Sequence, residues 1–244
     1  MNLKAQLRQF NEMDTIELKK IKIDDLVNKM LEQIGTTDSE LRDSLIYSTF
    51  VRLINEEILT EQQMIDVLEV CISDSHLFFK IGEENADSVF TRSFSALVVA
   101  AIISKDLKSR FLTEAMVMDC FEKSIQYVVG ERDVRGFVKG KGWAHSMAHG
   151  ADLMVAAVGH PLIEKHKTTV CLVAIKEALF KGSVYTDDED ERFLFVIDHL
   201  IVKDVEEEKL IGWIDTLYQQ LEDVHALNGF SNNIFMLELM SKIS

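Results

Sequence analysis

The spacing of its apolar residues is the feature that most constrains how this chain folds. Apolar side chains recur three and four positions apart over residues 41–54, and the same spacing returns over residues 64–72 and 211–221. This period places the apolar side chains on one face of an α-helix, and no segment shows the sustained alternation that is typical of strands. With one proline and 11 glycines among 244 residues, the chain also lacks the turn residues of an all-β fold. The pattern predicts an all-α protein.

About eleven antiparallel helices joined by short connections account for the pattern. They are expected to begin near residues 3, 24, 39, 61, 86, 113, 143, 162, 189, 206 and 230. Capping signals support several of these starts: Thr60 with Gln63, Asp188 with Glu191, Asp38 or Ser39, and Thr113. Residues 168–173 resemble a strand but continue into an apolar run, so a buried helix is expected there.

Short connections between successive helices favour stacked helix pairs, as in a HEAT-type α-solenoid, with a compact helical bundle as the alternative. No linker rich in proline, glycine or serine divides the chain, so residues 1–244 are expected to form a single all-helical domain.

The charge balance narrows the classes of partner. The chain has 26 Lys and Arg residues against 41 Asp and Glu residues, a formal net charge of −15. Such a surface repels phosphate backbones and anionic headgroups, so general binding to nucleic acid or to a membrane surface is not expected. The acidic runs at residues 187–191 and 204–208 fall where helices should start, and they are interpreted as solvated first turns, with a docking surface as the alternative.

The sequence favours a cytoplasmic protein. Its first residues include charges before any apolar run, which is not the pattern of a secretory signal. The scattered cysteines at 71, 120 and 171 are typical of reduced core residues. The apolar run at residues 96–103 is far shorter than the roughly 20 residues of a membrane-spanning helix, and it is expected to be a buried helix.

Residues 130–152 depart from the helical pattern. Five of the 11 glycines lie between Gly130 and Gly150, which predicts a shaped loop that leads into a helix near Trp143. On that helix His145, His149 and Asp152 share one narrow stripe, and small or apolar residues cover the core-facing side. Trp143 is expected either to pack the helix start into the core or to line a pocket.

Three interpretations of the stripe remain open. Two imidazoles and a carboxylate at this spacing can hold zinc or another divalent metal ion, with Glu131 or Asp133 as the fourth ligand. The same groups can instead form a metal-free hydrogen-bonded cluster with Arg135. In the third interpretation, a basic patch ahead of the helix N-terminus holds a carboxylate or phosphate; it comprises Arg132, Arg135, Lys139 and Lys141.

Arg92 lies inside an otherwise apolar helix. A charged residue in that position needs a carboxylate partner, and Asp133 or Asp152 is expected to supply it. The remaining histidines, at 76, 160, 166, 199 and 225, look like ordinary surface or core residues. The sequence has no phosphate-binding P-loop, no dinucleotide-binding glycine motif and no nucleophile elbow.

Two motifs in and after the glycine-rich loop form a distinctive pattern. They read Asp133-x-Arg135-Gly136-Phe137-Val138 and Gly142-Trp143-Ala144-His145-x-x-Ala148-His149-x-Ala151-Asp152. Together with residues 89–94 they resemble an uncharacterised bacterial family, domain of unknown function 2785. The resemblance implies a cytoplasmic bacterial protein and no particular activity. It groups six residues into one constellation: Arg92, Asp133, Arg135, His145, His149 and Asp152.

Two functions follow as hypotheses. The first is a helical-repeat binding protein whose polar groove, formed by the loop and helix of residues 130–152, takes a protein partner or a small anionic ligand. The second is a metal-dependent hydrolase in which the stripe holds the metal, Glu131 or Asp133 is the general base, and Arg135 neutralises charge on the substrate. A structural subunit without a small ligand is a further possibility. Arg92 and Trp143 complete the set of candidate pocket residues.

Overall fold

The computed structural model describes residues 2–167, 169–182, 185 and 187–228. Within them the only sheet is one two-stranded hairpin, and the remaining regular structure is helical, so the predicted all-α class is confirmed. The elements in order are α1 (Leu3–Glu12), α2 (Thr15–Leu18), α3 (Asp24–Glu32), the π-helical turn η1 (Glu40–Tyr47), α4 (Ser48–Asn55), α5 (Glu61–Cys71), α6 (Ser88–Ser109), α7 (Glu114–Gly130), β1 (Phe137–Val138), β2 (Gly142–Trp143), α8 (Ser146–Gly159), the 3₁₀ turn η2 (Lys165–Lys167), α9 (Thr169–Leu179), α10 (Arg192–Val202) and α11 (Glu207–Asn228).

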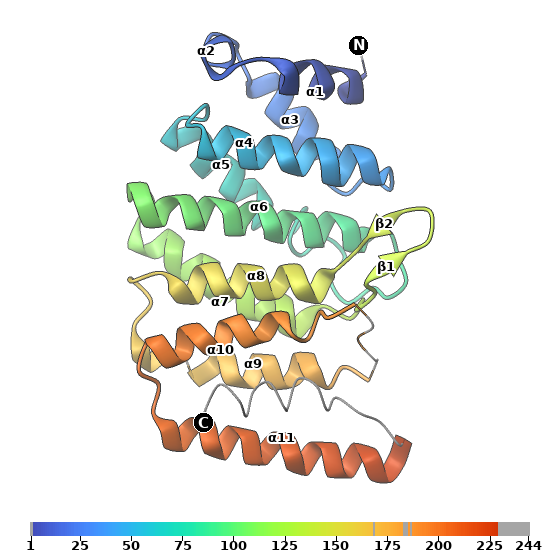
Figure 1. Ribbon diagram of the computed structural model, residues 1–244, viewed down its shortest axis with the longest axis vertical. Coiled ribbons are helices and arrows are strands. Elements are labelled where there is room, and N and C mark those ends of the chain that lie inside the picture. Colours follow the sequence, from blue (N-terminus) through green and yellow to red (C-terminus); the bar gives the residue numbers. More distant parts are fainter. Residues whose placement is uncertain (1, 168, 183–184, 186, 229–244) are drawn as a thin grey trace.

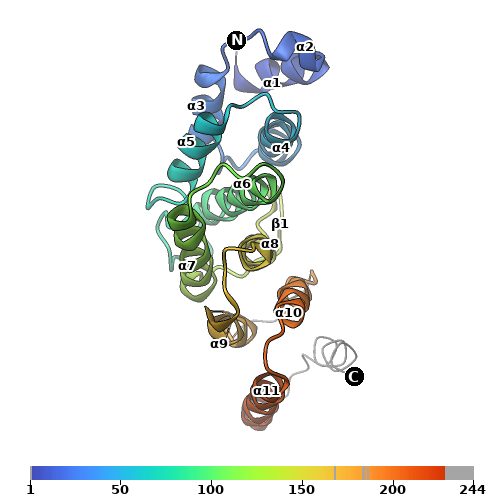
Figure 2. The ribbon, with the colours of Figure 1, turned by 90° about the vertical axis from the view of Figure 1, so that its left-hand side faces the viewer.

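The helices stack in layers along the long axis of the molecule (Figure 1). Figure 2 shows two columns, with α4, α6, α8 and α10 in one and α3, α5, α7 and α9 in the other. Contacts follow the columns, because α6 packs against α4 and α8, α8 against α10, and α9 against α7 and α11. This layering agrees with stacked helix pairs, while the narrower HEAT-type assignment and the single domain stay predictions.

Most helix starts lie where the sequence predicts them, and three lie later in the chain. The helices expected near 143, 162 and 189 begin at Ser146, Thr169 and Arg192. Strand β2 occupies the expected start near 143, and the 3₁₀ turn η2 precedes α9. The short helix α2 was not expected, and the helix expected near 230 lies outside the described residues.

Two predicted helix caps are confirmed, at helices whose starts were also predicted correctly. Thr60 and Gln63 form the predicted capping box at α5, and Thr113 caps α7 through the backbone N–H of Met116. The capping box predicted at Asp188 is wrong, since Asp188 has a positive φ of 59° and no side chain caps α10. The Glu189 carboxylate, next in the chain, is turned inward and accepts the backbone N–H of Asp187.

Helix α6 is the centre of the core. It contacts α4, α5, α7 and α8, and most of its side chains are buried, including the whole run of residues 96–100. By length and composition it is the one described helix that could cross a membrane, but 72% of its apolar window is buried by the rest of the protein. The three cysteines are free and buried, as predicted.

Candidate functional site

The glycine-rich loop folds into a β-hairpin between α7 and α8, on one side of the stack beside α6 and α8 (Figure 1). Strands β1 and β2 pair antiparallel, with Phe137 opposite Trp143. Gly140 and Gly142 take positive φ values of 78° and 80°, a conformation that glycine adopts without strain, so the chain can reverse there. The predicted helix start near Trp143 is therefore wrong, because these residues form a strand.

A buried ion pair fixes the segment that leads into the hairpin. The Arg92 guanidinium donates to both carboxylate oxygens of Glu131, at 2.6 and 2.7 Å, and both side chains are fully buried. Arg92 also donates to the backbone carbonyl of Phe79, and Glu131 accepts two backbone N–H groups of the following residues. The prediction that Arg92 has a carboxylate partner is confirmed, but the partner is Glu131 and neither Asp133 nor Asp152.

A second ion pair holds the next turn of the same segment. Arg135 donates to both oxygens of Asp133, at 2.6 and 2.7 Å, and to the carbonyl of Ala86 ahead of α6. Asp133 is almost fully buried. Glu131 and Asp133 are thus occupied by arginines, which leaves neither free to act as a fourth metal ligand or general base, and Arg135 does not bond to the histidines.

Arg42 ties the second strand of the hairpin to η1. Its fully buried guanidinium donates to the carbonyls of Thr36, Lys141 and Trp143. It also lies against the rings of Phe90 and Phe94, with centroid distances of 4.2 and 4.8 Å. Arg42 is not among the site residues that the sequence predicts. A signal was present, since Arg42 has helical spacing to Leu45, Ile46 and Thr49 on the apolar face.

Two glycines let the hairpin pack this closely. A Cβ on Gly142 would lie 2.6 Å from the Cβ of Ser39 and 3.1 Å from the Arg42 guanidinium. A Cβ on Gly136 would collide with the carboxylates of Asp187 and Glu189. The hairpin is therefore enclosed from η1 on one side and from the loop before α10 on the other.

His145 is the link between the hairpin and α8. It has left-handed backbone angles, φ 46° and ψ 36°, and precedes the helix. Its Nδ1 lies 3.1 Å from the Glu189 carboxylate, which is 1% exposed, so this acidic residue is not a solvated one as predicted. Its ring stacks on Trp143 at 4.3 Å and 5°.

The outer face of the hairpin is aromatic. Trp143 is 40% exposed and Phe137 56% exposed, and their rings pack edge to face at 5.0 Å. The expectation that Trp143 packs the helix start into the core is therefore not met. We refer to Phe137, Trp143 and His145 as the aromatic platform.

Below the platform, His149 is held in one tautomer. The Ser93 hydroxyl donates its single proton to the carbonyl of Ala144 and lies 2.6 Å from His149 Nδ1. Because that proton is already used, Nδ1 must carry the hydrogen and Ser93 must accept it. The lone pair of His149 is therefore on Nε2. Phe94 packs its ring edge-to-face with this imidazole at 5.3 Å.

The third residue of the predicted stripe, Asp152, pairs with another element. Its carboxylate lies 3.4 Å from the Arg192 guanidinium at the start of α10. Burial raises the pKa of Asp152, while Arg192 and His145 oppose this shift. Burial likewise raises the pKa of Asp43, whereas Arg42 and His145 act to lower it.

The structure does not arrange the stripe as a metal centre. In the described part of the chain, no group of three or more His, Cys, Asp or Glu side chains is placed to hold a metal ion. His145 and His149 are neighbours, with ring centroids 5.8 Å apart, but His145 faces Glu189, and Asp152 faces Arg192. The helical geometry that predicted convergence fails because His145 lies outside the helix.

The predicted basic patch is also divided. Lys141 pairs with Asp87 at 2.6 Å and Arg135 with Asp133, while Lys139 is exposed in the hairpin turn. Arg132 lies apart from these three and lines a pocket between α7, α9 and α11. The patch does not form one anion site at the start of α8.

His149 is expected to stay neutral under all ordinary conditions. Burial, followed by the positive charges of His145, Arg192 and Arg42, lowers its pKa from 6.5 to about 3. The unfolded imidazole still takes up a proton near pH 6.5, so the contribution of this group to stability is complete above that pH and is lost as the pH falls toward 3. Nitrogen-15 NMR should show an Nδ1–H tautomer that does not titrate between pH 7 and about 4.

The exposed His166 provides the control in the same spectra, since its side chain is 69% exposed. A His149 titration near pH 6, or an Nε2–H tautomer, would contradict the hydrogen-bond assignment.

Comparison with known families gives one match. A family model described as "Protein of unknown function (DUF2785)" matches residues 77–238, about two thirds of the chain. The chain belongs to this family. No curated protein and no solved structure matches it.

In this DUF2785 chain the predicted constellation splits into two groups. Arg92, Asp133 and Arg135 belong to the ion pairs that anchor the hairpin, whereas His145, His149 and Asp152 lie at the start of α8. Three residues from distant parts of the chain contact the hairpin or the two histidines: Glu189, Ser93 and Arg42.

A further histidine belongs to the core, one of the two places that the sequence allows for it. His160, interpreted as an ordinary surface or core residue, is fully buried and lies 3.0 Å from Asp106 at the opposite end of α8. Asp106 also accepts two backbone N–H groups after α6, so this cluster joins the ends of two helices.

Proposed function

We propose that this DUF2785 protein is a binding protein, and that the aromatic platform on the hairpin contacts a protein partner. One observation carries the proposal: two large aromatic side chains, Phe137 and Trp143, are exposed on a short hairpin that buried ion pairs hold in place. Aromatic side chains of this kind supply much of the binding energy at protein interfaces.

The anchoring beneath the platform favours recognition over a purely structural role. Arg42 and the Arg92–Glu131 pair are fully buried around this hairpin and its leading segment. Burying two arginines is costly unless each is well paired and hydrogen-bonded. A surface that is fixed before binding loses less conformational entropy when a partner arrives, which favours affinity.

The polar groups beside the platform define the chemistry of the partner. His149 has its lone pair on Nε2, and the partly exposed carboxylates of Asp43 and Asp152 pair with Arg42 and Arg192. All three accept hydrogen bonds. The partner segment is therefore expected to place an apolar side chain against Phe137 and Trp143 and a hydrogen-bond donor toward His149.

The hydrolase hypothesis has no comparable support among the described residues. The carboxylates that it needs as base or fourth ligand, Glu131 and Asp133, each bind an arginine through both oxygens. We therefore carry forward the binding function alone.

Replacing both exposed aromatics should abolish partner binding without unfolding the protein. The amount of partner captured by the variant Phe137→Ser/Trp143→Ser is expected to fall at least about tenfold below that captured by wild type. Each aromatic anchor contributes on the order of 2 kcal/mol to binding. The measurement is quantitative capture from cells of the native host, after photo-crosslinking from a benzophenone amino acid at position 139. The crosslinked partner is identified by mass spectrometry and then purified for titration.

The matched control is Ile16→Ser/Ile21→Ser, which removes two exposed apolar side chains at the far end of the stack. This control should retain the partner. Equal retention by the platform variant and wild type would overturn the proposal, as would equal loss in the control.

A further inference from the structure

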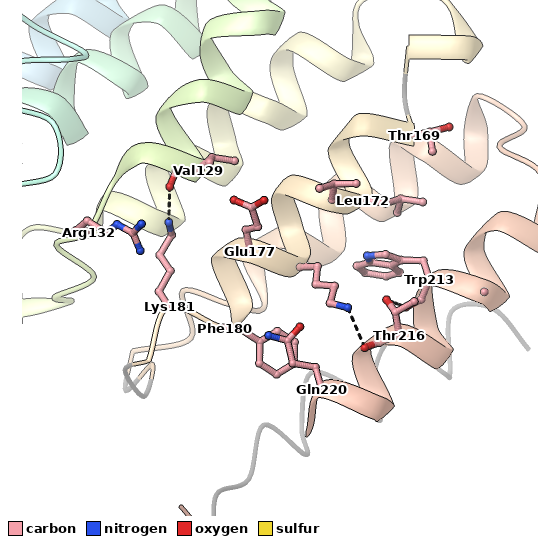
Figure 3. A pocket seen from close by; sticks show the side chains of 13 residues that line it. Val129, Arg132, Thr169, Leu172, Glu177, Phe180, Lys181, Trp213, Thr216 and Gln220 are labelled. Carbon is pink, nitrogen blue, oxygen red and sulfur yellow. Dashed lines mark hydrogen bonds between the residues drawn. The ribbon is translucent and has the colours of Figure 1, made fainter. Parts of the chain in front are cut away.

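A separate pocket lies between α7, α9 and α11, away from the hairpin (Figure 3). Its volume is about 690 Å³, which is large enough for a small organic molecule. Figure 3 shows Arg132 and Lys181 at one end and Trp213 at the other, with Leu172 on the wall between them. The pocket thus has a polar end and an apolar end.

The polar end is positively charged and not neutralised by a direct ion pair. Lys181 Nζ donates to the carbonyl of Val129 at 2.9 Å, and Arg132 lies close enough to repel it. Among the described residues, neither cation has a carboxylate within ion-pair distance. Lys176, which donates to the carbonyl of Thr216, adds a third positive charge, and Glu177 is the only carboxylate in the described lining.

The apolar end is built from Leu172 and Trp213, and Phe180 adds an apolar side chain elsewhere in the lining (Figure 3). Trp213 is 7% exposed, and its indole N–H has no hydrogen-bond partner among the described residues. A buried donor without an acceptor lowers the stability of the folded state.

We propose that this pocket binds a small amphipathic organic anion. Its acidic head, a carboxylate or a phosphate monoester, would lie between Arg132 and Lys181, and its apolar body would extend along Leu172 toward Trp213.

The basic side chains of this pocket stand out against the negative charge of the whole protein. In a chain with a net charge of −15, three basic side chains around one pocket with a single carboxylate reverse the local sign. Arg132 and Lys181 repel each other, and a bound anion reduces that repulsion. Neutral apolar molecules gain nothing from this arrangement, so the pocket should discriminate by charge.

The protonation of Lys181 gives the site a pH dependence. Burial, then the neighbouring Arg132, lowers the pKa of Lys181 to about 8, and Glu131 and Glu177 oppose the shift. Lys181 is therefore charged at neutral pH and loses its charge as the pH rises through about 8. Affinity for an anion should fall over the same range.

Fluorescence of Trp213 provides a direct test. The chain has two tryptophans, so the variant Trp143→Phe leaves Trp213 as the only indole reporter. In this background, octanoate and phenyl phosphate are expected to change the emission in a saturable way, whereas 1-octanol requires at least about tenfold higher concentration. The two anions distinguish a carboxylate from a phosphate head.

Variants then locate the head group. The double variant Arg132→Gln/Lys181→Gln should lose the preference for octanoate over 1-octanol. Circular dichroism should confirm that this variant is folded. The matched control, Lys20→Gln/Lys22→Gln, loses the same charge from exposed positions and should keep the preference. Raising the pH from about 7 to 9 should weaken octanoate binding in the control only.

Equal affinity for octanoate and 1-octanol would overturn the proposal. So would the absence of saturable binding of both anions below about 5 mM, or an unchanged preference in Arg132→Gln/Lys181→Gln. These outcomes are independent of the aromatic platform, because Trp143 and its partner do not enter the measurement.

Discussion

Replacing Glu131 with glutamine is expected to lower the free energy of unfolding by about 3 kcal/mol, because it leaves the Arg92 guanidinium buried without a counter-charge. Both side chains are fully buried and joined by two hydrogen bonds. The amide keeps the size of the carboxylate, so the loss reports on charge and hydrogen bonding rather than on a cavity. Urea denaturation followed by circular dichroism measures the change.

The backbone near Glu131 should respond as well. One carboxylate oxygen accepts the N–H groups of Arg132 and Asp133, and a glutamine can keep these bonds only by turning its NH₂ group toward Arg92. We therefore expect faster amide hydrogen exchange over residues 131–135 in Glu131→Gln than in wild type.

Two variants make this prediction specific. Glu164→Gln removes a carboxylate that is 69% exposed, and it should leave stability almost unchanged. The double variant Arg92→Met/Glu131→Gln removes both buried charges and is expected to be more stable than Glu131→Gln alone. If the two substitutions instead destabilise additively, the pair does not act as a coupled unit.

Replacing Arg42 with leucine should release the hairpin and lower the free energy of unfolding by about 2–4 kcal/mol. The substitution leaves the carbonyls of Thr36, Lys141 and Trp143 without their donor and removes the guanidinium between two phenylalanine rings. Because Arg42 is buried, any loss of partner binding in this variant arises from displacement of the platform.

Trp143 fluorescence in a Trp213→Phe background measures that displacement. We expect lower anisotropy and stronger quenching by acrylamide in Arg42→Leu, since the indole is no longer held against the stack. The control is Arg8→Leu, an exposed arginine paired with Glu40, for which stability and anisotropy should match wild type. Unchanged anisotropy in Arg42→Leu would show that the hairpin is held without this residue.

The helical pattern could be predicted from the sequence because it depends on local spacing. Starts such as Thr60 and Thr113 carry their capping signal within four residues, and the structure places both caps as predicted. Arg92 was recognised as a buried charge because its neighbours in the helix are apolar. Its partner was misassigned, since several carboxylates lie in the loop and only the packed backbone selects Glu131.

The sequence shows that residues 130–152 depart from the helical pattern, but it does not predict the geometry inside this segment. His145 and His149 are four residues apart, which suggests neighbouring positions on one helix face. A left-handed residue at His145 places its ring on Trp143 and its Nδ1 on Glu189, which lies 44 residues away. No local signal in the sequence predicts either contact.

By itself, the sequence determined the all-α class, a buried helix over residues 96–103, and the segment of residues 130–152 that departs from the pattern, because each depends on composition and periodicity over a few turns. The tertiary structure alone decided which groups meet. Arg42 reaches the hairpin from η1, Glu189 reaches His145 from the loop before α10, and Arg132 faces the pocket between α7, α9 and α11. These contacts join residues far apart in the chain, and their geometry depends on how whole helices stack, which residue spacing does not encode.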